Sequence, residues 1–183
     1  MMVEKNGTSR GLKIVYTGNG KGKTTAALGM CVRAVGYEWK ICLIQFIKGS
    51  WKYGELEGVK RLAPNLELHV VGEGFVGIID DKKDRRVHKE AARKGLALAR
   101  QKIESGTYDL VILDELNVAL KLGLVSKKDV QEMLTDCPDR QHLVITGRDA
   151  PDWLIEQVDL VTAMTEIKHP FTQGIPAQKG IDW

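Results

Sequence analysis

The residues best suited to chemistry lie in a glycine-rich stretch near the amino end, Thr17 to Thr25, with the sequence TGNGKGKTT. Residues 22–24 match the end of the phosphate-loop pattern G-x-x-x-x-G-K-[ST]. Lys23 would supply positive charge to phosphate oxygens, and the Thr24 hydroxyl could serve a Mg²⁺ ion. Backbone N–H groups of such a loop turn inward and cradle an anion. The glycines that permit this turn are Gly18, Gly20 and Gly22.

The loop departs from the general pattern at its first position. The first glycine of the pattern should stand at position 17, where this chain has Thr17. The loop also carries a second cation, Lys21, between two of its glycines. Because a buried strand is expected before the loop and a helix after it, we predict a working phosphate site despite the altered entrance.

A second chemical element is the segment LVILDE, Leu110 to Glu115. Its apolar run is typical of a strand buried on both faces, and it ends in two carboxylates. Taken alone, Asp114 and Glu115 could be a solvated turn or the start of a helix. Beside a phosphate loop, we expect them to hold the magnesium ion of a nucleotide, together with Thr24.

Alternating strands and helices predict how these residues are positioned. Strands are expected at residues 13–17, 40–46, 66–71, 110–113, 142–146 and 160–165, and helices at residues 24–35, 55–63, 84–104, 115–122, 126–135 and 151–157. This alternation predicts an α/β fold with a predominantly parallel sheet and helices on both faces, of the P-loop NTPase-like (RecA-like) type. Ligands of such folds bind beyond the carboxyl ends of the strands.

We expect a single domain over residues 1–183, because no linker interrupts the chain. Within it, residues 1–11 are expected to be a flexible amino terminus. Residues 167–183 are expected to be a carboxyl-terminal tail that contributes to the site.

Composition excludes several classes of protein. Hydrophobic residues make up 43% and charged residues 28%, and the formal net charge is only +3, too small to indicate nucleic-acid binding. No apolar run is long enough to span a membrane and the amino end has no signal core, so we expect a cytoplasmic protein. The three cysteines form no CxxC pair, which favours buried free thiols, and the histidines lack the spacing of a zinc site.

The motifs alone leave several nucleotide proteins open. No NKxD-type guanine motif is present, which argues against a GTPase. Residues 81–94 are rich in basic residues, but interleaved acids favour a solvated helix face over a nucleic-acid ATPase. A small-molecule kinase remains possible, with Arg148 beside the leaving phosphates. A carrier that binds a nucleotide without turnover is the non-enzymatic alternative.

Motifs spread along most of the chain narrow this choice. The chain resembles the P-loop type ATP:corrinoid adenosyltransferases, also called cob(I)alamin adenosyltransferases. The matching segments are TGNGKGKTTAA at residues 17–27, CVRAVG with Arg33, QFIKG at 45–49, GEGF at 72–75, LDEL at 113–116, ITGR at 145–148 and KHPFTQGIPAQKGIDW at 168–183. The loop together with this ending is the most specific part of the resemblance.

The resemblance implies a reaction in which Co(I) of a reduced corrinoid attacks the 5′ carbon of ATP. The adenosyl group is transferred and inorganic triphosphate leaves, so the loop would hold a leaving group. In this family ATP is understood to bind reversed in the loop, with which Thr17 at the entrance is compatible. The resemblance also implies Mg²⁺, a reductase or flavodoxin that supplies electrons for Co(I), and a homodimer.

Roles for individual residues follow from the same resemblance. Lys23, Thr24 and Glu115 would be catalytic, and Thr24, Glu115 and Asp114 would hold the metal. Phe75 is expected to contact the corrinoid, with Gly77 two residues later where the family has tryptophan. The residues expected to bind the nucleotide and its phosphates are Gly18, Asn19, Gly20, Lys21, Gly22, Lys23, Thr24, Thr25, Arg33, Arg148 and His169.

Overall fold

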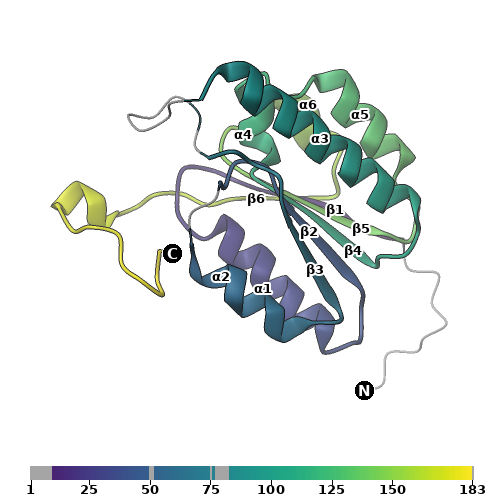
Figure 1. The fold of residues 1–183 in the computed structure, drawn as a ribbon, viewed down its shortest axis with the longest axis horizontal. Helices are drawn as coiled ribbons and strands as arrows, with labels where there is room; N and C mark the ends of the chain where they lie inside the picture. Colours follow the sequence, from purple (N-terminus) through teal and green to yellow (C-terminus); the bar gives the residue numbers. More distant parts are fainter. Residues whose placement is uncertain (1–9, 50–51, 75, 77–82, 183) are drawn as a thin grey trace.

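The computed structural model describes residues 10–49, 52–74, 76 and 83–182, and contains one six-stranded sheet in the order β3-β2-β4-β5-β1-β6 (Figure 1). All neighbouring strands pair in parallel. The strands are β1 (Lys13–Thr17), β2 (Ile41–Gln45), β3 (Leu66–Val70), β4 (Leu110–Asp114), β5 (His142–Thr146) and β6 (Leu160–Ala163). The predicted parallel sheet is thus confirmed.

Helices cover both faces of this sheet, with α1 and α2 on one side and α3, α4, α5 and α6 on the other (Figure 1). Their bounds are α1 (Lys23–Val35), α2 (Gly54–Gly58), α3 (Arg85–Glu104), α4 (Leu116–Lys121), α5 (Lys127–Asp136) and α6 (Asp152–Ile155). Two 3₁₀ turns complete the described elements, η1 (Val59–Leu62) and η2 (Pro170–Gln173). The α/β class with two covered faces, expected from the sequence, is confirmed.

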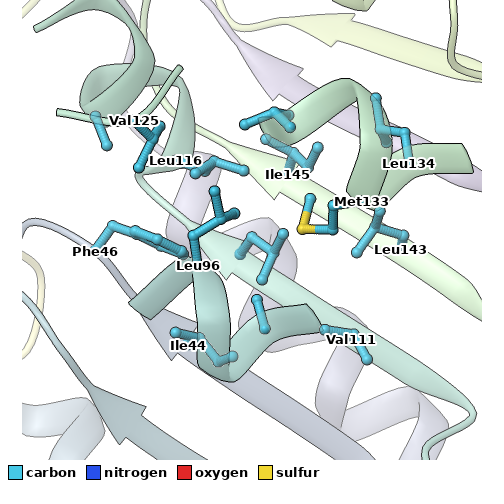
Figure 2. Packing of buried hydrophobic residues seen from close by; sticks show 14 of the residues in the cluster. Ile44, Phe46, Leu96, Val111, Leu116, Val125, Met133, Leu134, Leu143 and Ile145 are labelled. Atoms are coloured by element: carbon cyan, nitrogen blue, oxygen red, sulfur yellow. The ribbon is translucent and has the colours of Figure 1, made fainter. Parts of the chain in front are cut away.

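Two hydrophobic cores hold these layers together. Successive side chains of a strand point to opposite faces, so Cys42 and Ile44 of β2 pack toward α3, while Ile41 and Leu43 pack toward α1. Every residue of β2 and β4 is buried, as expected of central strands covered on both sides. Figure 2 shows the larger core, where Phe46 lies beside Leu96 of α3.

The strand order decides which loops meet. Strand β5 lies between β1 and β4, so the carboxyl ends of these three parallel strands are neighbours on the same side of the sheet's strand ends. The phosphate loop follows β1, Asp114 ends β4, and Gly147 follows β5. The fold therefore brings together segments that are about 100 residues apart in the sequence.

The sequence-based boundaries need correction in places. The predicted helix over residues 55–63 is split into α2 and the 3₁₀ turn η1, and α6 is shorter than the predicted 151–157. Strand β6 is an edge strand whose four residues are all exposed. In the described part of the chain, no helix combines the length and apolar character needed to cross a bilayer. The flexible terminus predicted at residues 1–11 lies largely outside the described residues.

Candidate active site

The phosphate loop joins β1 to α1 in a conformation that depends on glycine. Gly18 and Gly22 have φ values of 91° and 110°, which side-chain-bearing residues rarely adopt. A Cβ atom on Gly18 would lie 2.4 Å from the backbone oxygen of Met164. The Gly20 N–H donates to that same oxygen at 2.7 Å. The loop is thus packed against the chain directly after β6.

Lys23 places its ammonium group inside this loop. Its side chain is buried, and Nζ donates to the carbonyl oxygens of Gly18 and Gly20 at 2.8 Å each. Burial lowers the pKa of Lys23, an effect that nearby Glu115 opposes and Arg148 reinforces. The carbonyl oxygens carry no full negative charge, so this buried ammonium favours the binding of an anion, whose phosphate oxygens would compensate its charge.

Thr17, the departure from the general loop pattern, has a structural partner. Its side chain is buried, and its hydroxyl accepts a hydrogen bond from the backbone N–H of Ala150 at 3.2 Å. A glycine could not make this contact. Thr17 therefore ties the start of the loop to the segment that carries Arg148.

Asp114 is the centre of a buried hydrogen-bond network. It is fully buried, and its Oδ1 accepts from the hydroxyls of Thr24 at 2.9 Å and Thr146 at 2.7 Å. Its Oδ2 accepts from the side-chain amide of Gln45 at 3.1 Å. The structure thus brings Thr24 and Asp114, which the sequence suggested as metal ligands, into direct contact.

Glu115 lies beside this network in a strained backbone conformation. Its φ of 63° and ψ of 22° place it in the left-handed region, which costs energy for a residue with a side chain. Its N–H donates to the Thr146 hydroxyl at 2.9 Å. Burial, and then the neighbouring Asp114, raise the pKa of Glu115, while Lys23, Lys48 and Arg148 oppose the shift. Glu115 therefore lies within electrostatic range of the cations of the loops.

The carboxyl-terminal tail reaches the phosphate loop. Lys21 forms an ion pair with Asp182, whose other carboxylate oxygen accepts from the Gln178 N–H at 2.8 Å. His169 accepts from the Phe171 N–H through Nδ1 and begins the η2 turn. The charge of His169 also helps to lower the pKa of Asp182, after the larger effects of Lys21 and the Gln178 N–H.

The remaining predicted residues are distributed unevenly. Arg148 is exposed but close enough to influence both Lys23 and Glu115. Asn19 and Thr25 are exposed on the loop and on the first turn of α1. Arg33 is exposed near the far end of α1, about 15 Å of helix rise from Lys23. Phe75 and Gly77 lie outside the described residues.

Sequence reasoning missed three residues of the network, Gln45, Tyr53 and Thr146. The Tyr53 hydroxyl donates to Gln45 Oε1 at 2.6 Å, which extends the network to the segment before α2. Gln45 ends β2, which is otherwise apolar, and Thr146 ends β5, which is apolar except for its first residue, His142. A polar residue at that position was the available signal, because it lies at the carboxyl edge where ligands bind.

One further group of potential metal ligands occurs among the described residues, away from the phosphate loop. Ligand atoms of Cys42, Glu67 and His69 lie within 4.8 Å of one another. However, Glu67 already accepts from Lys102 Nζ at 2.8 Å and from the Tyr108 hydroxyl. Burial raises the pKa of the Cys42 thiol to about 12. A cation would meet an ammonium group and a protonated thiol, so we assign this group to an ion-pair network.

Comparison with known proteins decides what this site belongs to. The sequence profile of the family described as ATP:corrinoid adenosyltransferase BtuR/CobO/CobP matches residues 9–183. The chain belongs to the ATP:corrinoid adenosyltransferase family. The family suggested by the sequence motifs is therefore confirmed.

Relatives named as corrinoid adenosyltransferases agree with this assignment. A corrinoid adenosyltransferase of Pseudomonas aeruginosa is 41% identical over 95% of this chain and 84% of its own length. Corrinoid adenosyltransferases of Escherichia coli and Salmonella typhimurium are 38% and 35% identical, each over 95% of this chain and 86% of the relative.

A solved structure supports the fold alone. The flagellar accessory protein FlaH from Methanocaldococcus jannaschii aligns with a TM-score of 0.52 at 10% identity, covering 87% of this chain and 73% of FlaH. At this identity the likeness concerns the arrangement of sheet and helices.

Proposed function

We propose that this protein transfers the 5′-deoxyadenosyl group of ATP to the Co(I) centre of a reduced corrinoid and releases inorganic triphosphate. The observation that carries the proposal is the contact of Thr24 with the buried carboxylate of Asp114 beside Lys23, in a chain that belongs to this family. These residues fit the demand of the reaction, because the group that leaves is a highly charged triphosphate.

The phosphate loop would bind the triphosphate through its backbone N–H groups and Lys23. In the transfer, Co(I) supplies the electron pair for the new Co–C bond, and the C5′–O bond breaks with its electrons going to the triphosphate. Negative charge therefore grows on the triphosphate, where Lys23 and the positive end of α1 would stabilise it. Cobalt is itself the nucleophile, so the residues need not act as a general base.

The oxygen groups beside the loop fit Mg²⁺, which prefers oxygen ligands. The Thr24 hydroxyl and the carboxylates of Asp114 and Glu115 would hold the ion, directly or through water. When bound, Mg²⁺ would neutralise charge on the triphosphate as it leaves. The hydrogen bonds that Asp114 accepts from Thr24, Thr146 and Gln45 fix the orientation of its carboxylate, which would help it to hold this ion.

The tail and the remaining predicted residues would complete the site. The ion pair of Lys21 with Asp182 supports a role for residues 167–183 as a cover over the phosphate loop. Asn19, Arg148 and His169 would approach the nucleotide, and Phe75 the corrinoid.

Assembly and cellular setting remain part of the proposal. We propose a cytoplasmic homodimer that works with a reductase or flavodoxin, which supplies the electrons that reduce the corrinoid to Co(I), as the family resemblance implies. Arg33 lies far from Lys23 along α1, so a role in phosphate binding would be easier to satisfy across a dimer interface than within one chain.

An anaerobic alkylation assay tests the function. Protein, MgATP and chemically reduced cobalamin are mixed, and the light-sensitive spectrum of the alkylated product is followed, with cobinamide in parallel. We expect turnover by the wild type and none by Lys23→Ala. Lys40→Ala should turn over normally, because it removes an exposed lysine just before β2, at the amino ends of the strands and away from the phosphate loop. ADP formation without alkylation would favour a kinase or ATPase, and tight binding without turnover would favour a carrier.

A further inference from the structure

Gln45 links Asp114 to a segment that no motif of the phosphate site includes. It is the last residue of β2, fully buried between Asp114 and Tyr53. Gln45 Nε2 lies 3.1 Å from Asp114 Oδ2, and Gln45 Oε1 lies 2.6 Å from the Tyr53 hydroxyl. A fully buried amide with a partner on each side specifies a single arrangement of its neighbours.

The ionisation state of the groups determines which atom donates in each of these two hydrogen bonds. An ionised carboxylate can only accept hydrogen bonds, so the amide nitrogen of Gln45 must face Asp114. The amide oxygen then faces Tyr53, whose hydroxyl must donate. Burial, reinforced by Glu55 and Asp114, raises the pKa of Tyr53 to about 12, so the phenol keeps the proton that it donates.

The backbone of Gln45 also contacts the loop that follows β3, residues 71–74, and continues directly into the loop at residues 46–49. Its carbonyl oxygen accepts from the N–H groups of Val71 at 3.0 Å and Gly72 at 3.2 Å, just after β3. The two loops pack backbone against backbone, because a Cβ atom on Gly72 would lie 2.6 Å from the carbonyl oxygen of Phe46. A Cβ atom on Gly49 would lie 2.7 Å from the Gly74 nitrogen. A shift of either loop therefore acts on Gln45.

The segment around Tyr53 also carries charge toward the site. The Lys48 ammonium lies 4.5 Å from the centre of the Tyr53 ring and is paired with Glu55. The same ammonium opposes the raised pKa of Glu115, so its charge acts on one of the carboxylates proposed to hold the metal. Tyr53 and Lys48 thus pack together at the end of the hydrogen-bonded series that runs from Asp114 through Gln45 to Tyr53.

We propose that Gln45 and Tyr53 are positioning residues that hold Asp114 in the orientation required for the magnesium–triphosphate complex, and that they couple this orientation to the loops at residues 46–49 and 71–74. The inference rests on the proposed function, because it assumes that Asp114 serves Mg²⁺. Neither residue needs to touch a substrate. Their effect should therefore depend on the metal ion and should be visible before any transfer step.

Calorimetric binding of ATP to the full chain, with Mg²⁺ and separately with EDTA, tests this inference. Tyr53→Phe leaves Gln45 Oε1 without its donor, and we expect MgATP to bind about tenfold more weakly. Gln45→Met leaves Asp114 Oδ2 without a partner, and we expect a loss between about tenfold and 100-fold. Binding of metal-free ATP, which uses the loop amides and Lys23, should stay unchanged in both variants.

Tyr108→Phe is the matched control. It also removes a tyrosine hydroxyl that donates a hydrogen bond, in this case to the carboxylate of Glu67, at a distance from the phosphate loop. It should change thermal stability without changing MgATP affinity. Equal losses of MgATP and metal-free ATP binding in Tyr53→Phe, or no loss of either, would overturn the inference.

Experiments can distinguish a failure of the proposed transfer from a failure of the positioning role of Gln45 and Tyr53. If wild-type protein forms no alkylcobalamin but Tyr53→Phe still weakens the binding of MgATP and not that of metal-free ATP, the proposed function fails while the positioning role stands. If alkylation proceeds and the Tyr53→Phe variant keeps wild-type MgATP affinity, the positioning role alone fails.

Discussion

Replacement of Asp114 by asparagine tests the network at its centre. The substitution keeps the shape of the side chain and removes its charge. Asparagine can still accept from Thr24 and Thr146 through its oxygen. Its amide nitrogen would then face Gln45, whose own amide can rotate so that its oxygen accepts. Tyr53 can switch from donor to acceptor, so every present contact survives as a neutral hydrogen bond.

The expected loss of stability follows from these contacts. Asp114 is fully buried and accepts three hydrogen bonds, from Thr24, Thr146 and Gln45. A bond to a charged group is stronger than a neutral one by about 1 kcal/mol, and relief of the buried charge offsets part of the sum. We expect Asp114→Asn to lower the free energy of unfolding by about 1 to 3 kcal/mol. The variant should therefore remain folded.

The substitution should also weaken the binding of the metal–nucleotide complex. Without its carboxylate, the pair of Thr24 and residue 114 should bind MgATP about 10- to 100-fold more weakly, whereas metal-free ATP should bind as before. Urea unfolding measures the stability and calorimetry the two affinities. An Asp114→Asn variant with wild-type MgATP affinity would refute the assignment of Asp114 to the metal. A variant that fails to fold would refute the view that the network can rearrange.

Three further outcomes are expected from features outside this network. Thr17→Val should cost about 1 to 2 kcal/mol of unfolding free energy, and Thr17→Ser much less, because only valine removes the acceptor for the backbone N–H of Ala150; equal stability in urea would contradict this contact. Burial raises the pKa values of Cys31 and Cys42 to about 12, so at pH 8 both thiols should react with a chromogenic disulfide reagent only as the chain unfolds, and rapid reaction of the native protein would contradict their burial. Although burial opposes it, hydrogen bonds from Lys102 and Tyr108 lower the pKa of Glu67 from 4.5 to about 2, so this carboxylate stabilises the fold above pH 4.5 and its contribution is lost as the pH falls toward 2. Glu67→Gln should therefore flatten the pH dependence of unfolding in that window, and an unchanged slope would show that the carboxylate is not paired in solution.

The sequence was sufficient where local pattern and chemistry agree. The glycines of the phosphate loop, the apolar strand ending in Asp114 and the alternation of elements were all predicted, because each follows from a short stretch of residues. The strand order places β5 between β1 and β4, and this long-range choice brings Thr146 to Asp114. No local pattern specifies such a contact.

Other features required the three-dimensional arrangement. Gln45 looks like an ordinary strand-end residue until burial and its two partners are known. The left-handed conformation of Glu115 was not predicted, because glycine usually marks such positions. The role of Thr17 likewise depends on Ala150, which is distant in the sequence. Arg33 was named from the family motif, and its place near the end of α1 separates it from the loop.

In the proposed transfer, the bond between the 5′ carbon and its oxygen breaks and the three phosphates leave together. The most direct test is to identify the phosphorus products by ³¹P NMR while alkylcobalamin forms from MgATP and chemically reduced cobalamin under anaerobic conditions. We predict one inorganic triphosphate for each adenosylcobalamin formed, with no ADP. Release of ADP, or of phosphate and pyrophosphate without any triphosphate or adenosylcobalamin, would contradict the proposed reaction.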